Sequence, residues 1–157
     1  MAISLIVSDL MSRAPRTIRP DATVLDAYAI MTESAIRHLP VVSFGGELVG
    51  VVTHRDLLTG DVCTRDQSLL SEESEFVRDT LVAEVMTASC EVVSPETELS
   101  EAATILIANK IGCLPVMDGE ELIGILTESD FVRYVLEEEI EAAEERIVVP
   151  RNNPAGH

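Results

Sequence analysis

The chain of 157 residues contains 46% hydrophobic and 25% charged side chains, a balance that is typical of a globular protein and argues against long disorder. Its formal net charge of −17, its 3% aromatic content and its lack of tryptophan disfavour nucleic acid and anionic lipid as partners. Three cysteines without paired or metal-type spacing, no basic and apolar leader, and no apolar run of about 20 residues predict a cytoplasmic protein that does not enter a membrane.

An internal repeat organises the chain. Residues 7–56 align with residues 82–130, at an offset that falls from 75 to 74 in the middle. The change lies in Ser43–Gly46, which aligns with Asp118–Glu120 and separates two short β-branched runs in each copy. Because a turn tolerates one extra residue, each of these segments is predicted to be the turn of a β-hairpin.

The first half of each copy predicts a short strand followed by a helix. Strands are expected near residues 16–19 and 91–94, each ended by a proline that cannot donate to a strand ladder. Apolar residues then recur at i, i+3, i+4 and i+7 from Val24 and again from Leu99. This spacing is typical of an amphipathic helix that buries one face.

The second half of each copy predicts a hairpin followed by another helix. These second helices are expected to begin after Thr53 and after Thr127. Between the copies, residues 59–81 predict a loop and then a helix that carries Phe76. Residues 133–146 predict an amphipathic helix with a glutamate-rich face, which either covers the module's own edge or contacts a second subunit.

Each copy therefore consists of strand, helix, strand, strand and helix in about 50 residues, too few to bury a core of its own. We expect an α+β fold in which the two repeats pack about a pseudo-twofold axis, with helices outside and a cleft between them that can hold a ligand. The expected organisation is repeat 1 at residues 7–60, a linker and helix at 61–81, repeat 2 at 82–136, and an acidic C-terminal helix and tail at 137–157.

Four short runs recur in the same order in both copies. In the first copy they are Asp-Leu-Met-Ser at 9–12, Thr-Ile-Arg-Pro at 17–20, Arg-His-Leu-Pro-Val-Val at 37–42 and Gly-Val-Val-Thr-His-Arg-Asp at 50–56. In the second copy they are Glu-Val-Met-Thr at 84–87, Val-Val-Ser-Pro at 92–95, Leu-Pro-Val-Met at 114–117 and Gly-Ile-Leu-Thr-Glu-Ser-Asp at 124–130. These runs resemble the CBS domain throughout. The resemblance implies a Bateman module, a tandem CBS pair that regulates enzymes, channels or transporters and often binds AMP, ADP, ATP or S-adenosylmethionine.

Thr53 and Asp56, like Thr127 and Asp130, lie where a strand turns into a helix. A threonine followed three residues later by an acid is a capping box, which stabilises a helix start without any ligand. The alternative, which the resemblance favours, is that each carboxylate accepts hydrogen bonds from ribose hydroxyls while the threonine faces phosphate. Both roles are compatible. The glycine three residues before each threonine either relieves crowding in the strand or clears space for a ligand.

The resemblance also implies two pockets, because in this family the edge strand of one copy faces the threonine and aspartate of the other. The first pocket would be formed by Thr17, Ile18, Val42, Thr127 and Asp130. The second pocket would be formed by Val92, Val93, Met117, Thr53 and Asp56. The structural alternative is that the apolar members of both sets are core residues.

Four basic or titratable residues are predicted to converge at one edge of the first copy. Folding of the first hairpin brings Arg37 and His38 alongside His54 and Arg55. The corresponding positions of the second copy carry no cation, and they are Gly112, Cys113, Glu128 and Ser129. The arginines could simply pair with some of the many carboxylates, but a phosphate-binding site explains the clustering better.

The sequence contains no Ser/His/Asp arrangement, phosphate loop or metal-ligand spacing, so we expect no catalytic residue, no cofactor and no metal. The leading hypothesis is a stand-alone, non-enzymatic regulatory module that binds adenine nucleotides in the cleft and signals to a separate partner protein. We expect it to be a homodimer. The alternatives are a structural dimerisation or scaffold module with empty clefts, a module for S-adenosylmethionine, and a single-stranded nucleic-acid binder, against which the net charge argues.

Overall fold

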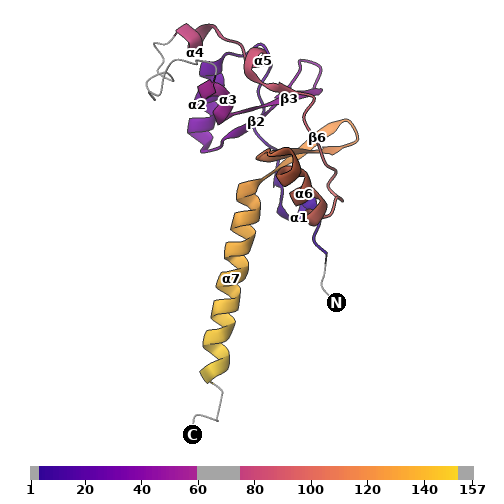
Figure 1. The fold of residues 1–157 in the computed structure, drawn as a ribbon, viewed down its shortest axis with the longest axis vertical. Helices are drawn as coiled ribbons and strands as arrows, with labels where there is room; N and C mark the ends of the chain where they lie inside the picture. Colours follow the sequence, from indigo (N-terminus) through magenta and orange to yellow (C-terminus); the bar gives the residue numbers. More distant parts are fainter. Residues whose placement is uncertain (1–3, 60–74, 152–157) are drawn as a thin grey trace.

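The computed structural model describes residues 4–59 and 75–151. The first copy contains α1 (Val7–Leu10), β1 (Ser12–Arg13), α2 (Val24–Ser34), β2 (His38–Val42), β3 (Leu48–Thr53) and α3 (His54–Thr59). After it come α4 (Glu75–Asp79), α5 (Val82–Val85), β4 (Thr87–Ala88), α6 (Leu99–Asn109), β5 (Cys113–Asp118), β6 (Glu121–Thr127) and α7 (Glu128–Arg151). Figure 1 shows the two copies packed against each other as two small α+β units, which confirms the predicted fold class.

Two three-stranded antiparallel sheets form the body, in the orders β1-β6-β5 and β2-β3-β4. Both predicted hairpins are present, as β2–β3 and β5–β6. The third strand of each sheet comes from the other copy: Ser12 of β1 pairs with Ile125, and Ala88 of β4 pairs with Gly50. The two copies therefore exchange their first strands.

The segments expected to form strands at 16–19 and 91–94 make only one parallel bridge each. Ile18 pairs with Val41, and Val93 pairs with Val116. Both bridges use the same pattern, in which the Ile18 N–H donates to Pro40 O at 3.0 Å and the Ile18 O accepts from the Val42 N–H at 2.8 Å. The prediction of regular strands here was wrong, because the regular pairing occurs a few residues earlier, in β1 and β4. Each of these strands is followed directly by a residue with positive φ, Ala14 at 48° and Ser89 at 54°.

Two of the buried clusters among the described residues show how the copies depend on each other. The first core contains Leu39 and Val52 of the first hairpin, and Val82 from α5 is buried in it. The second core contains Leu114 of the second hairpin and Val7 from α1. Each core thus includes a short helix that belongs, in sequence, to the other copy. This arrangement confirms the prediction that neither copy completes a core alone.

The predicted amphipathic helices are confirmed as α2 and α6. In α2 the Asp26 N–H donates to Thr23 Oγ1 at 3.2 Å and the Thr23 N–H donates to Asp26 Oδ2 at 2.9 Å, so that a complete capping box begins the helix. The helix predicted in the linker is α4, whose Val77 is buried and whose Phe76 packs against the first core. The loop expected before α4 falls in residues 60–74, and the tail beyond Arg151 is likewise outside the described residues.

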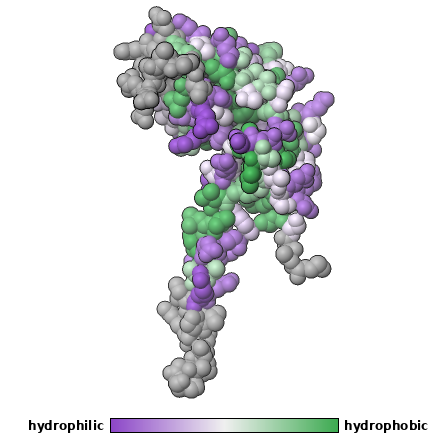
Figure 2. All heavy atoms as spheres, in the orientation of Figure 1, coloured by the Kyte–Doolittle hydropathy of each residue, from purple (hydrophilic) through white to green (hydrophobic). Residues whose placement is uncertain are grey.

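The last helix leaves the body of the molecule. Figure 1 shows the C-terminal part of α7 projecting away from both sheets. Its apolar residues Val132, Val135, Leu136 and Ile140 remain 50–68% exposed, and Figure 2 shows apolar side chains gathered over the part of α7 nearer the body. The predicted amphipathic helix is present, but these side chains do not cover the module's own edge. Among the described helices, none has both the length and the apolar character needed to cross a bilayer.

Candidate ligand-binding site

Thr53 and Asp56 begin α3 with reciprocal capping contacts. The Thr53 N–H donates to Asp56 Oδ2 at 2.8 Å, and the Asp56 N–H donates to Thr53 Oγ1 at 3.2 Å. At the start of α7, the N–H and the hydroxyl of Thr127 both donate to Asp130 Oδ2, at 2.8 and 3.3 Å. The capping box predicted for Thr53 and Asp56 is therefore complete, whereas at α7 the acid accepts from the Thr127 N–H and the Thr127 hydroxyl donates to the acid. Any role in binding comes in addition to these contacts.

Asp130 is held more tightly than a capping residue needs to be. Its side chain is only 4% exposed, and its Oδ1 accepts from Arg133 Nη1 at 3.3 Å. Thr127 and Arg133 each lie three residues from Asp130 in the chain. A ribose hydroxyl that reached Asp130 would have to share this carboxylate with Arg133 and the Thr127 amide.

The two glycines of these motifs have a structural explanation. A Cβ on Gly50 would lie 2.6 Å from the Thr87 carbonyl oxygen, and a Cβ on Gly124 would lie 2.7 Å from Met11 Sδ. Thr87 lies in the exchanged strand β4, and Met11 immediately precedes β1. The glycines therefore let the exchanged strands approach, which explains them without any ligand.

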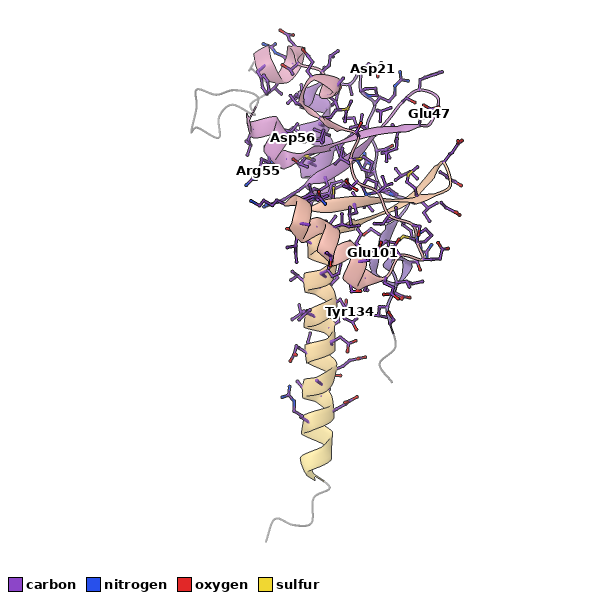
Figure 3. All side chains as sticks on the ribbon, turned by 45° about the vertical axis from the view of Figure 1, so that its right-hand side comes forward. Asp21, Glu47, Arg55, Asp56, Glu101 and Tyr134 are labelled. Atoms are coloured by element: carbon purple, nitrogen blue, oxygen red, sulfur yellow. The ribbon has the colours of Figure 1, made fainter. Side chains whose placement is uncertain are left out.

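The four cationic candidates meet as the hairpin register predicted. His38 pairs with Thr53 in the β2–β3 ladder, and the His54 N–H donates to Arg37 O at 2.8 Å. The side chains of Arg37 and Arg55 are exposed, and Figure 3 shows Arg55 beside Asp56 on α3 at the edge of the body. The backbone therefore gathers the cluster, and its two arginines reach solvent.

His38 differs from the arginines because it lies at the seam between the copies. A Cβ on Gly112 would lie 2.8 Å from His38 Nε2. Burial lowers the pKa of His38, with Arg37 acting in the same direction and with Glu128 and Asp56 opposing it. The lowered pKa favours the neutral imidazole at pH 7. Glu128 lies beside this contact, because its N–H donates to Gly112 O at 3.1 Å.

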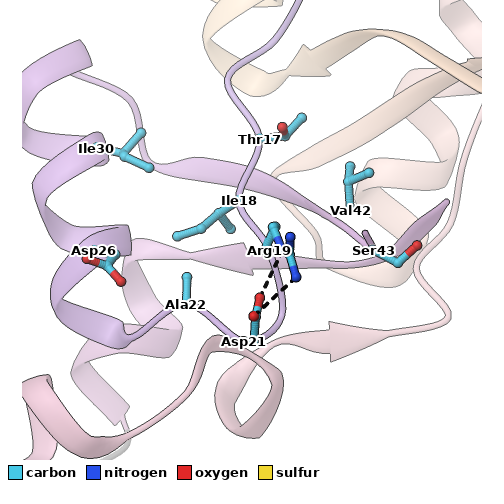
Figure 4. Close-up of a pocket in the computed structure, with 9 residues that line it drawn as sticks. All are labelled: Thr17, Ile18, Arg19, Asp21, Ala22, Asp26, Ile30, Val42 and Ser43. Carbon is cyan, nitrogen blue, oxygen red and sulfur yellow. Dashed lines mark hydrogen bonds and ion pairs between the residues drawn. The ribbon is translucent and has the colours of Figure 1, made fainter. Parts of the chain in front are cut away.

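A cavity of about 630 Å³ lies along the outer side of β2 (Figure 4). It is lined by Thr17, Ile18, Arg19, Asp21, Ala22, Asp26, Ile30, Val42 and Ser43. Three residues predicted to hold a ligand, Thr17, Ile18 and Val42, are thus brought together. Their predicted partners Thr127 and Asp130 do not line this cavity, which is built from the first copy alone.

Sequence reasoning missed the polar side of this cavity. Arg19 makes a two-pronged ion pair with Asp21, with Nε to Oδ1 at 3.0 Å and Nη2 to Oδ2 at 3.2 Å. The Arg19 Cζ also lies 4.9 Å from the centroid of the Phe44 ring. The available signal was adjacency, since Arg19 directly follows Thr17 and Ile18 in the chain.

The second predicted set forms an equivalent edge in the second copy. The Val93 N–H donates to Pro115 O at 3.1 Å, and the Met117 N–H donates to Val93 O at 2.8 Å. Val93 is buried in the second core, Met117 is half-buried and Val92 is 43% exposed. Ile18 and Val42 make the same pattern of bonds in the first copy, so the two edges are related by the pseudo-twofold symmetry. That Val92, Val93 and Met117 share a pocket with Thr53 and Asp56 stays a prediction.

Comparison with known proteins gives the same picture of two copies. The family model described as CBS domain matches residues 7–62 and 82–137. The chloroplastic CBS domain-containing protein CBSX2 of Arabidopsis thaliana is 33% identical over 138 residues, which are 76% of this chain and 58% of that protein. An inosine-5′-monophosphate dehydrogenase of Methanocaldococcus jannaschii is 33% identical over 118 residues, which are 74% of this chain and 21% of that enzyme. The chain thus spans only part of these relatives.

Solved structures share most of this arrangement of sheets and helices. The crystal structure of CBSX2 in complex with AMP has a TM-score of 0.69 at 35% identity, covering 85% of this chain and 98% of that one. The CBS domain pair of protein MJ0100, in complex with 5′-methylthioadenosine and S-adenosyl-L-methionine, has a TM-score of 0.71 at 23% identity and covers 87% of this chain and 99% of that one, which shows a shared fold. With two matched copies that exchange strands across one seam, this chain belongs to the CBS-domain family as a tandem CBS pair.

Proposed function

We propose that this CBS pair is a regulatory module, not an enzyme, which binds an adenine nucleotide (AMP, ADP or ATP) and signals to a separate partner protein. The observation that carries the proposal is the cavity beside β2, since it is lined by Thr17, Ile18 and Val42, the residues expected to hold the base. Its volume of about 630 Å³ falls within the range of small-molecule sites. The AMP complex of CBSX2, a relative of the same fold at 35% identity, supports the choice of ligand.

The remaining parts of the nucleotide have candidate partners at the seam. Asp56 and Asp130 offer carboxylates to ribose hydroxyls, and the helix starts at Thr53 and Thr127 offer hydroxyls. Phosphate would meet the cationic cluster of Arg37, His38, His54 and Arg55. The matching edge of Val92, Val93 and Met117 is proposed as the base site of the second pocket.

We also propose that the module is a homodimer and works in the cytoplasm. Phe76 on the linker helix α4 packs against the first core and is half-buried, which leaves α7 as the main apolar surface. Ile107 on α6 and Val132 on α7 are 79% and 68% exposed, and a second copy would bury such side chains. The free thiols of Cys90 and Cys113 agree with a reducing compartment.

A thermal-shift screen tests the nucleotide proposal. AMP, ADP, ATP and S-adenosylmethionine would each be added to the full chain, with guanine nucleotides and inorganic phosphate as controls. A ligand present at about 100 times its Kd adds roughly 2.7 kcal/mol to stability, so an adenine nucleotide should raise Tm clearly. A shift with S-adenosylmethionine alone would favour that ligand class. No shift with any of them would favour the scaffold alternative.

A further inference from the structure

Arg19 and Asp21, which line the cavity beside β2, form a cluster with Phe44. The guanidinium of Arg19 makes two parallel contacts to the carboxylate of Asp21, at 3.0 and 3.2 Å. Its Cζ lies 4.9 Å from the centroid of the Phe44 ring, at the tip of the β2–β3 turn. Figure 4 shows Arg19 and Asp21 joined at the cavity, near Val42 and Ser43. Phe44 itself is 87% exposed.

This arrangement fixes the plane of the guanidinium. A single exposed ion pair contributes little to stability, and the Arg19 and Asp21 side chains are 49% and 66% exposed. A fork of two bonds together with an aromatic contact nevertheless restricts rotation, because both depend on the orientation of the flat group. Arg19 therefore presents a planar, positively charged surface where it lines the cavity.

The other cavity walls suit a flat apolar ring. Ile18, Ala22, Ile30 and Val42 supply apolar side chains, and Ile18 is anchored to β2 by its bridge to Val41. A guanidinium stacks favourably on an aromatic face, and it can do so on both of its own faces. Phe44 is near one face of Arg19, and a ligand ring could take the other.

The second copy has no equivalent of this arrangement. The positions that align with Arg19 and Asp21 are Ser94 and Glu96, and the turn Asp118–Glu120 contains no aromatic residue. Ser94 has a neutral side chain and cannot stack on an aromatic ring as a guanidinium does. The arrangement is therefore specific to the first-copy cavity.

We propose that Arg19 determines ligand specificity by stacking on the planar heteroaromatic base of the ligand, between that base and Phe44. This inference rests on the proposed function, and it names the chemical group that the first-copy cavity selects. Asp21 acts as a positioning residue that keeps the guanidinium plane in place. The contact is to the base, so it does not depend on a phosphate.

Calorimetric titration of the full chain with adenosine and with AMP tests the proposal. Arg19→Ala should weaken both ligands by the same factor, about tenfold. Arg19→Lys should lose nearly as much, because it keeps the charge and loses the planar fork. The matched control is Arg16→Ala: Arg16 is also an exposed arginine, its Nη1 donates to Ser34 Oγ at 3.0 Å, and it does not line the cavity.

Each other result overturns the proposal in a distinct way. Equal affinities in Arg19→Ala and Arg16→Ala would show that Arg19 makes no contact with the ligand. A loss confined to AMP would assign Arg19 to the phosphate, and wild-type affinity in Arg19→Lys would show that charge alone matters. In all three cases the proposed nucleotide function still stands. A wild-type chain that binds neither adenosine nor AMP would overturn both proposals together.

Discussion

The imidazole of His38 packs against Gly112 of the other copy, where a Cβ would lie only 2.8 Å from His38 Nε2. Gly112 aligns with Arg37, the residue before His38, so the contact lies where equivalent edges of the two copies meet. Burial at this seam lowers the pKa of His38, and Arg37 adds to the effect, while Glu128 and Asp56 oppose it. The protonation of one histidine is therefore linked to the packing of the two copies.

This linkage predicts that acid weakens the module through His38. The pKa of His38 in the folded protein lies below its ordinary value of 6.5. At pH values between these two pKa values the unfolded chain binds more protons than the folded one, so stability is lost as the pH falls through 6.5 toward the folded pKa. Urea unfolding at several pH values should show a smaller loss of stability in His38→Asn than in the wild type. His54→Asn, at the same edge, is the matched control. An unchanged pH dependence in His38→Asn would contradict the assignment.

The close approach of the exchanged strands predicts a strong effect of small substitutions. Gly50→Ala would place its Cβ 2.6 Å from the Thr87 carbonyl oxygen, a backbone atom that cannot simply rotate away. We expect a loss of about 1–3 kcal/mol in the free energy of unfolding, measured by chemical denaturation. Gly45→Ala is the control, since its nearest neighbour would be Ser43 Oγ at 3.9 Å. Equal stabilities of the two variants would contradict this explanation of Gly50.

Local patterns predicted the parts of the fold that are local. The spacing from Val24 and from Leu99 predicted α2 and α6, because helix periodicity is a property of neighbouring residues. The exchange of β1 and β4 was not predictable in this way. Ser12 pairs with Ile125, and no pattern within either segment marks a partner more than a hundred residues away.

The residues of the candidate site likewise fall into those that local patterns predicted and those that depend on tertiary packing. Thr53 and Asp56 were predicted because they lie three residues apart, and the gathering of Arg37 with His54 followed from one hairpin. The contact between Arg19 and Phe44 joins two loops, and the burial of His38 depends on a glycine of the other copy. These last two features follow from tertiary packing, so the sequence pattern did not reveal them.

The double role proposed for the two aspartates predicts losses of both stability and binding. Asp56→Ala and Asp130→Ala should each cost about 1 kcal/mol of stability through the lost cap. Each should also weaken nucleoside binding at one pocket by roughly 1.5–3 kcal/mol, because a charge-assisted hydrogen bond is lost. Melting and calorimetry should be measured on the same samples.

The control for these variants removes an acid that caps a helix but does not line the cavity. Glu84 Oε2 accepts from the Leu81 N–H at 2.7 Å at the start of α5, and Glu84 does not line the cavity. Glu84→Ala should therefore lower stability without affecting binding. If the aspartate variants behave like Glu84→Ala, both aspartates are caps only.

The exposed apolar face of α7 predicts a dimer that should dissociate when charged residues are introduced on that face. Sedimentation of the wild type at tens of micromolar should give twice the monomer mass, and Leu136→Glu with Ile140→Glu should give the monomer, because glutamates cannot be buried without partners. Glu141→Ala, on the opposite face of α7 from Val132, should leave the mass unchanged. A wild-type monomer at every concentration would end the dimer proposal.

The unequal distribution of cations predicts unequal pockets. The pocket around Thr53 and Asp56 should prefer phosphorylated ligands, because Arg37 and Arg55 reach solvent beside it. At an effective dielectric near 20, one unit charge about 4 Å from a phosphate is worth roughly 4 kcal/mol before desolvation, enough to decide which pocket fills first. Calorimetry should therefore show one tight AMP site that raised salt weakens.

Arginine substitutions separate this local effect from the overall charge. Arg37→Ala and Arg55→Ala should weaken the tight site, whereas Arg146→Ala, which removes the same charge from α7, should not. Because Glu128 lies near His38 at the seam, its carboxylate also repels phosphate, and Glu128→Gln should tighten AMP binding. Two equal and salt-insensitive sites would contradict the asymmetry. Tighter AMP binding in Asp56→Ala than in Asp130→Ala would mean that the cations serve a phosphate whose ribose lies on Asp130.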